Sequence, residues 1–131
     1  MQFTLKAEFP VSAESLYKAW LSSEGHSKMT GSKAVVGKQI GDRFTAWDGY
    51  ISGTHLELKP FSRIVQSWRT TEFPKGQSDS LVELTFSEQT GKKELTLHHS
   101  SLGREDHHYK KGWEDHYITP MKAYFEREAP L

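Results

Sequence analysis

The chain has 131 residues, and its 17 Lys and Arg residues balance its 17 Asp and Glu residues, so the formal net charge is zero. This length suits one domain with one core, and a neutral chain without a basic run lacks the electrostatic footprint of a nucleic-acid-binding protein. The absence of cysteine excludes disulfides, thiolate metal sites and cysteine nucleophiles.

The first thirty residues predict one strand followed by one or two short helices. Apolar and polar residues alternate over 2–9, which is the period of a strand with one buried face. Pro10 ends this strand, and Ser12 is a suitable N-cap for a short helix whose apolar stripe includes Trp20. The polar stretch over 22–30 is the candidate for a second short helix.

Residues 33 to 100 predict about six antiparallel strands. Asp48-Gly49 is a strong hairpin signal, because a type I′ turn needs a positive φ at both central residues. In the next strand the apolar positions change from odd to even around Gly53-Thr54, which predicts a β-bulge that bends the sheet. The other strands are expected near 34–36, 44–47, 63–69, 82–87 and 94–99, with an exposed loop over 71–79.

Residues 107–128 predict one long helix that covers the sheet. Its aromatic and apolar residues fall in an arc of roughly 160°, and charged residues lie opposite. Such a wide apolar face needs a broad cover, which the strands supply. The sequence therefore predicts an α+β helix-grip fold, in which a long C-terminal α-helix grips a curved antiparallel sheet, in a single domain spanning residues 1–131. Pro120 removes one backbone hydrogen bond from the middle of the helix and predicts a bend there.

Four segments of the chain carry a family resemblance. In order, they are SAESLYKAW, GDRFTAWDGYISGTHLELKPFSRIVQSWR, FPKGQSDSLVELTF and GWEDHYITPMKAYFE. In order and spacing they resemble the family of activator-of-heat-shock-protein-90-ATPase homologues, which belongs to the START-like, or Bet v 1-like, superfamily. The resemblance extends from about residue 3 to residue 126, and its most specific pieces include the Asp48-Gly49 hairpin and the Gly112-Trp113 pair.

The resemblance implies a co-chaperone of the stress response, with a chaperone of the heat-shock protein 90 class as its partner. The eukaryotic co-chaperones of the family carry this domain behind another domain that also engages the chaperone. Because this chain begins with its first strand, we expect that other domain to be absent. Many single-domain members of the family resemble binders of small molecules or lipids. The resemblance brings no catalytic residues and no cofactor.

The aromatic residues supply the candidate binding site. We expect a pocket between the sheet and the C-terminal helix, with His99 and Tyr117 as its polar groups. Its candidate lining residues are Trp20, Phe44, Trp68, His99, Trp113, Tyr117 and Met121. The alternative is that these large side chains fill the space and leave no pocket. For His99 the corresponding alternative is a core histidine whose hydrogen bonds are satisfied by the protein.

The remaining polar residues do not form a recognisable catalytic or metal-binding motif. The histidines lack the spacing of a helical zinc pair, because His108 and His116 are eight residues apart. No serine elbow and no phosphate-binding glycine loop is present in the sequence. Phe73 and Pro74 are candidates for contact with a partner protein, provided that their loop exposes the aromatic ring. The alternative is a loop that folds back onto the body.

The leading hypothesis is a non-enzymatic binding domain with a hydrophobic groove under the C-terminal helix. Its partner would be a small apolar ligand or lipid, or a chaperone. The first alternative is a co-chaperone that acts through its surface and has a filled core, and the second is an enzyme that uses the same cavity. No apolar run approaches the roughly 18 residues of a membrane span, and no signal peptide follows Met1, so we expect a soluble cytoplasmic protein.

Overall fold

Seven antiparallel strands form one sheet in the computed structural model, which describes residues 1–128. The order of the strands across the sheet is β1-β7-β6-β5-β4-β3-β2, so β1 and β2 are its edges. In chain order they are β1 (Phe3–Glu8), β2 (Val35–Val36), β3 (Arg43–Ala46), β4 (Ile51–Lys59), β5 (Arg63–Thr70), β6 (Ser80–Gln89) and β7 (Lys92–Ser100). The first strand therefore crosses the sheet to pair with the last one, and the intervening strands form a meander.

Two short helices lie between β1 and β2, namely α1 (Ala13–Trp20) and α2 (Ser23–Thr30). A serine caps each of them. The Ser12 hydroxyl accepts a hydrogen bond from the backbone N–H of Ser15, and the Ser22 hydroxyl accepts one from that of Gly25. The polar stretch after the first helix thus forms a second helix, as the sequence predicted.

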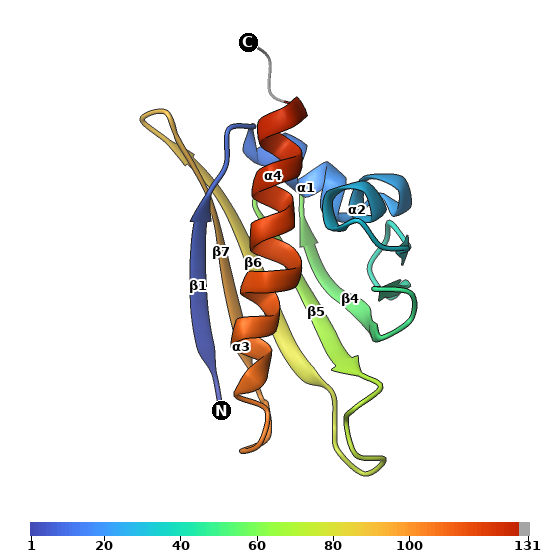
Figure 1. Ribbon diagram of the computed structural model, residues 1–131. Coiled ribbons are helices and arrows are strands. Elements are labelled where there is room, and N and C mark those ends of the chain that lie inside the picture. Colours follow the sequence, from blue (N-terminus) through green and yellow to red (C-terminus); the bar gives the residue numbers. More distant parts are fainter. Residues whose placement is uncertain (129–131) are drawn as a thin grey trace.

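The C-terminal helix consists of three consecutive segments: α3 (His108–Trp113), the π-helical turn η1 (Glu114–Ile118) and α4 (Thr119–Glu128). Figure 1 shows these segments as one rod lying along one face of the sheet, with α1 and α2 beside its C-terminal half. The predicted helix-grip fold is therefore confirmed. Its C-terminal helix begins at His108, one residue after the predicted start, and ends at Glu128 as predicted.

The π-helical turn is located where Pro120 interrupts the regular hydrogen bonding of the helix. Proline lacks a backbone N–H and its ring collides with the carbonyl group four residues earlier. The N–H of Thr119 donates to the carbonyl of Glu114, five residues back, which widens the helix just before the proline. The chain thus accommodates Pro120 with a π-helical turn instead of a break.

The β3–β4 hairpin agrees with the sequence, but the bulge lies further along β4 than predicted. Asp48 and Gly49 have φ values of 55° and 89°, as a type I′ turn requires. The pairing of β4 with β5 changes register between His55 and Glu57, so Leu56 is the extra residue, and it is 48% exposed. The predicted position at Gly53-Thr54 was wrong. His55 is buried, as Ile51 is, so the odd-numbered side chains of β4 still face the core at residue 55.

One core of large side chains occupies the space between the sheet and the helices. Rings of the C-terminal helix contact rings of the sheet: Phe125 meets Phe9 edge to face, and the centroid of Trp113 is 5.6 Å from that of Trp68. Within residues 1–128, no helix combines the length and the apolar character that crossing a membrane would need.

Candidate functional site

A groove of about 760 Å³ opens between the N-terminal half of the C-terminal helix and the strands β4 and β5. Its sheet side is lined by Trp47, Tyr50, Ile51 and Trp68, and its helix side by Tyr109, Gly112, Trp113 and Tyr117. Pockets for small organic ligands begin at roughly 300 Å³, so the groove has room for a ligand of several rings.

The rim of the groove carries polar and charged side chains from the exposed side of the helix. They are His107, His108, Lys111, Asp115 and His116. The ammonium group of Lys111 is 3.4 Å from the carboxylate of Asp115, one helical turn away. The groove thus combines an aromatic interior with a polar edge. Within residues 1–128, His, Asp and Glu side chains do not gather in groups of three that could hold a metal ion.

Unusual backbone conformations occur on both sides of the groove. Trp47 has a φ of 51°, in the left-handed region that a bulky residue rarely adopts. Its ring lies edge to face against that of His116, with 5.2 Å between the centroids. His116 belongs to the π-helical turn η1. Strained backbone and π-helical turns both occur preferentially at functional sites, and here the two features contact each other.

A chain of hydrogen bonds under the groove fixes the protonation state of His99. The indole N–H of Trp113 donates to Nδ1 of His99 at 2.9 Å, so Nε2 carries the proton and donates to the Ser80 hydroxyl at 2.8 Å. That hydroxyl donates to the backbone carbonyl of Trp68 at 2.8 Å. Burial lowers the pKa of His99 to about 3. His99 is therefore a neutral core histidine with both ring nitrogens satisfied.

A second buried histidine, His26, which no motif in the sequence marks, holds the hydroxyl of Tyr117. Nδ1 of His26 lies 2.9 Å from the carbonyl oxygen of Trp20, which can only accept, so Nδ1 carries the proton. Nε2 of His26 then accepts from the Tyr117 hydroxyl at 2.7 Å. Burial lowers the pKa of His26 to about 4 and raises that of Tyr117.

Hydroxyl groups at the β4–β5 end of the groove also have protein partners. The Tyr50 hydroxyl donates to the carboxylate of Glu72. The Tyr109 hydroxyl is 2.5 Å from Oγ1 of Thr70. Burial, followed by the hydrogen bond to Glu72, raises the pKa of Tyr50, so this tyrosine is a neutral donor at physiological pH.

The structure separates the seven candidate pocket residues into two groups. Trp68, Trp113 and Tyr117 line the groove. The others are buried elsewhere in the core: Trp20, Phe44, His99 and Met121. Thus the space between helix and sheet is filled beneath α4, where Met121 is fully buried, and hollow beside α3 and η1.

Sequence reasoning missed four of the aromatic and apolar residues on the groove, namely Trp47, Tyr50, Ile51 and Tyr109. The first three belong to the β3–β4 hairpin, whose position the sequence predicted. The missing information was that β4 begins opposite α3, which depends on how the sheet is placed against the helix. Tyr109 belongs to the aromatic face of the helix predicted over 107–128, and its place on the groove depends on the same arrangement of sheet and helix.

The loop that carries Phe73 and Pro74 does not expose the aromatic ring to a partner protein. Phe73 is buried, and its ring packs against those of Trp68 and Tyr109 with centroid distances of 6.0 Å and 5.8 Å. The guanidinium of Arg69 covers the same ring. Pro74 is exposed. The loop is thus folded back onto the body, and a partner protein cannot contact the Phe73 ring without opening it.

The comparison with protein families agrees with this fold. The model of the family described as "Activator of Hsp90 ATPase homolog 1-like protein" matches residues 10–126. The chain belongs to this family. The human activator of 90 kDa heat shock protein ATPase homolog 1 is 30% identical over 131 residues, which are 99% of this chain and 38% of the human protein. The homolog 2 of mouse is 29% identical over 122 residues, or 92% of this chain and 37% of the mouse protein.

This member of the family spans about two fifths of the length of those curated relatives. Solved structures share its fold over nearly the whole chain. An Hsp90 activator from Plasmodium falciparum superposes with a TM-score of 0.83 at 23% identity, covering 94% of each chain. The Aha1 dimer from Colwellia psychrerythraea gives a TM-score of 0.78 at 13% identity, covering 95% of this chain and 96% of that one.

Proposed function

We propose that this domain is a non-enzymatic binding domain that takes a small apolar ligand in the groove between α3–η1 and the β3–β4 hairpin. The observation that carries the proposal is the groove itself, about 760 Å³ in volume and walled by aromatic rings from both the sheet and the helix. Burying an apolar ligand against such walls contributes roughly 25 cal/mol per Å² of surface removed from water.

The state of the nearby polar groups favours binding over catalysis. The imidazole of His99 and the hydroxyl of Tyr117 are hydrogen-bonded to protein groups, and burial holds the pKa of His99 far below neutral. The hydroxyls of Tyr50 and Tyr109 are also paired. A general base needs a pKa near the working pH and access to the substrate, and these four groups do not offer that combination.

Gly112 provides a direct test of the groove. A Cβ built on this residue meets nothing within 4 Å among the described residues, although Gly112 lines the groove. We expect Gly112→Leu to fill the groove and to weaken the binding of an apolar probe by at least about tenfold. The measurement is a titration of the ¹⁵N-labelled protein, in which amides of residues 107–117 and 47–51 shift as the probe binds.

The matched control is Gly76→Leu, because Gly76 also has open space around its Cβ position and lies in the β5–β6 loop, away from the groove. Its probe affinity should equal that of the unchanged protein. If Gly112→Leu binds the probe as tightly as Gly76→Leu does, the groove is not the binding site and the proposal fails.

Family membership favours a second function, in which the domain contacts a chaperone of the heat-shock protein 90 class through its surface. The relatives are named as activators of that chaperone's ATPase. The test is the rate of ATP turnover of the cognate chaperone with and without this protein, and an unchanged rate would exclude activation. A cytoplasmic location and a role in the stress response stay predictions that accompany this candidate.

A further inference from the structure

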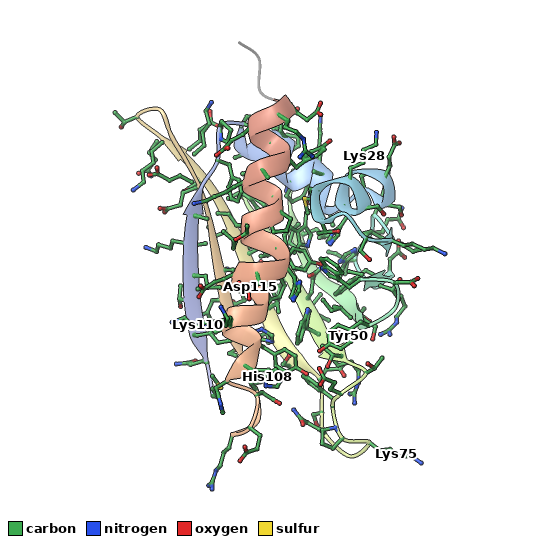
Figure 2. All side chains as sticks on the ribbon, in the orientation of Figure 1. Lys28, Tyr50, Lys75, His108, Lys110 and Asp115 are labelled. Carbon is green, nitrogen blue, oxygen red and sulfur yellow. The ribbon has the colours of Figure 1, made fainter. Side chains whose placement is uncertain are left out.

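Gly112 occupies the centre of the helix wall of the groove. Residues three and four positions apart are neighbours on a helix surface, and all four such neighbours of Gly112 line the groove, namely His108, Tyr109, Asp115 and His116. Figure 2 shows His108 and Asp115 along the helix, and Tyr50, of the sheet wall, to one side of it. A side chain at position 112 would therefore point into the groove.

Neither packing nor backbone conformation explains why this position is a glycine. A Cβ built on Gly112 meets nothing within 4 Å, so no neighbouring group among residues 1–128 requires the small residue. Its backbone is helical and its φ is not positive, which is a conformation that any residue adopts. Glycine nevertheless destabilises a helix interior relative to alanine, because it loses more backbone entropy on folding. What this glycine provides is open space in the middle of the groove wall.

The groove has room for several rings, and a ligand that fills it must lie against this glycine. A cavity of about 150 Å³ holds one benzene ring, which is roughly a fifth of the volume of about 760 Å³ that the groove has. A molecule of one ring can therefore bind without touching Gly112. A molecule of several rings has to pass over the helix backbone there, opposite a sheet wall that carries the rings of Trp47, Tyr50 and Trp68.

The walls favour a ligand whose buried part is uncharged. The hydroxyls of Tyr50, Tyr109 and Tyr117 and the indole N–H of Trp113 are hydrogen-bonded to protein groups. A polar group buried against these walls would lose its hydrogen bonds to water, and the four wall groups are already engaged. The ion pair on the rim carries no net charge, so it gives little preference for a cation or an anion.

We propose that Gly112 determines the size of the ligand, and that this ligand is an uncharged molecule of several rings that lies across the bare helix backbone at Gly112. A side chain at this position would stabilise the helix but would exclude such a molecule, so the protein gives up some stability to keep the space. This inference rests on the proposed function, because it names the class of ligand for the same groove and the residue that selects it.

Gly112→Ala tests this role, because it adds one methyl group to the groove and should leave the fold at least as stable as before. The probes are N-phenyl-1-naphthylamine, which has three rings, and toluene, which has one. Both are uncharged, and both should shift the amides of residues 47–51 and 107–117 in the unchanged protein.

The two probes should respond differently to the added methyl group. We expect Gly112→Ala to bind the naphthylamine about tenfold more weakly, since one methylene group in a close-fitting hydrophobic pocket changes discrimination by about 10- to 200-fold. Toluene can avoid the methyl group, so its affinity should change by less than about twofold. The fluorescence of the naphthylamine and the amide shifts with toluene give the two affinities, and urea denaturation confirms that the variant is folded.

Gly76→Ala is the control, because the Cβ position of Gly76 is also open and lies outside the groove, so both affinities should stay unchanged. If Gly112→Ala changes neither affinity, or weakens toluene as much as the naphthylamine, the inference is overturned and the groove remains a binding site. Binding of toluene but not of the naphthylamine by the unchanged protein would also overturn it. If neither probe shifts the amides of the groove, the proposed function is refuted, and the inference is refuted with it.

Discussion

The indole N–H of Trp113 donates a hydrogen bond of 2.9 Å to Nδ1 of His99, from the C-terminal helix to strand β7. Both side chains are buried. The bond selects the tautomer of His99 and connects the helix to the chain of hydrogen bonds that ends at the backbone of Trp68. The floor of the groove is therefore held by polar contacts of defined geometry as well as by packing.

Replacing Trp113 should show both contributions. Trp113→Ala removes a buried indole from between helix and sheet and should lower the free energy of unfolding by about 3–5 kcal/mol. Trp113→Phe keeps an aromatic ring but leaves Nδ1 of His99 without a donor, so it should cost about 1–3 kcal/mol from the lost bond, in addition to the lost volume. Urea denaturation measures both values. A near-neutral effect of Trp113→Ala would place the ring at an open surface.

Acid should destabilise the fold through its buried histidines, since burial lowers the pKa of His55 as well as those of His26 and His99. The pKa values of His26 and His99 are lowered to about 4 and about 3, against an ordinary value of 6.5. As the pH falls below 6.5, the unfolded chain binds protons at these positions before the folded chain does, so the free energy of unfolding falls. Each histidine contributes a slope of roughly 1.4 kcal/mol per pH unit between 6.5 and its folded pKa.

The measurement is a series of denaturant titrations from pH 8 to pH 5. The comparison variant is His26→Gln, which removes one titrating group. It should reduce the slope below pH 6.5 by roughly 1.4 kcal/mol per pH unit and lower the free energy of unfolding at every pH. An identical slope in the two proteins would mean that His26 has the same pKa in the folded and the unfolded chain, and would contradict its lowered pKa.

The hydroxyl of Tyr117 should contribute to stability because it satisfies His26. Tyr117→Phe keeps the ring, which stacks on Trp20 at a centroid distance of 5.1 Å, and leaves Nε2 of His26 without its donor. We expect a loss of about 1–3 kcal/mol in the free energy of unfolding. A matched control is Tyr124→Phe, because Tyr124 is only partly buried; this change should alter stability by less than about 0.5 kcal/mol. Equal effects of the two changes would show that the His26 bond contributes little.

The sequence predicted the elements of this fold because their periods are local. Alternation defined β1, β6 and β7, and the 3.6-residue period defined the C-terminal helix. The bulge was misplaced by two to three residues, since a polar residue such as His55 gives no sign in the sequence that it is buried. His26 escaped notice for the same reason, because its burial depends on Tyr117, which is 91 residues away in the chain.

The candidate site was only partly predictable. The sequence identified Trp68, Trp113 and Tyr117 as residues of the two apolar faces, and they do line the groove. It could not indicate that the groove opens beside α3 and not beneath α4. That difference depends on how the β3–β4 hairpin is placed against the helix, where Trp47 contacts His116.

Gly53 should be the least replaceable glycine of the sheet. A Cβ at this position would lie 1.8 Å from the carbonyl oxygen of Ser67 in β5 and 2.7 Å from the Phe44 ring in β3. The backbone of the neighbouring strand cannot move aside without disturbing its own pairing, so Gly53→Ala should cost about 3 kcal/mol or more.

The control for Gly53→Ala is Gly112→Ala, at a helical position whose Cβ meets nothing within 4 Å. That change should raise the free energy of unfolding by about 0.5–1 kcal/mol, because alanine loses less backbone entropy than glycine when a helix forms. Thermal and urea denaturation of the two variants give the difference directly. If Gly53→Ala were as stable as the unchanged protein, β4 and β5 would have to lie further apart at this point than the structure places them.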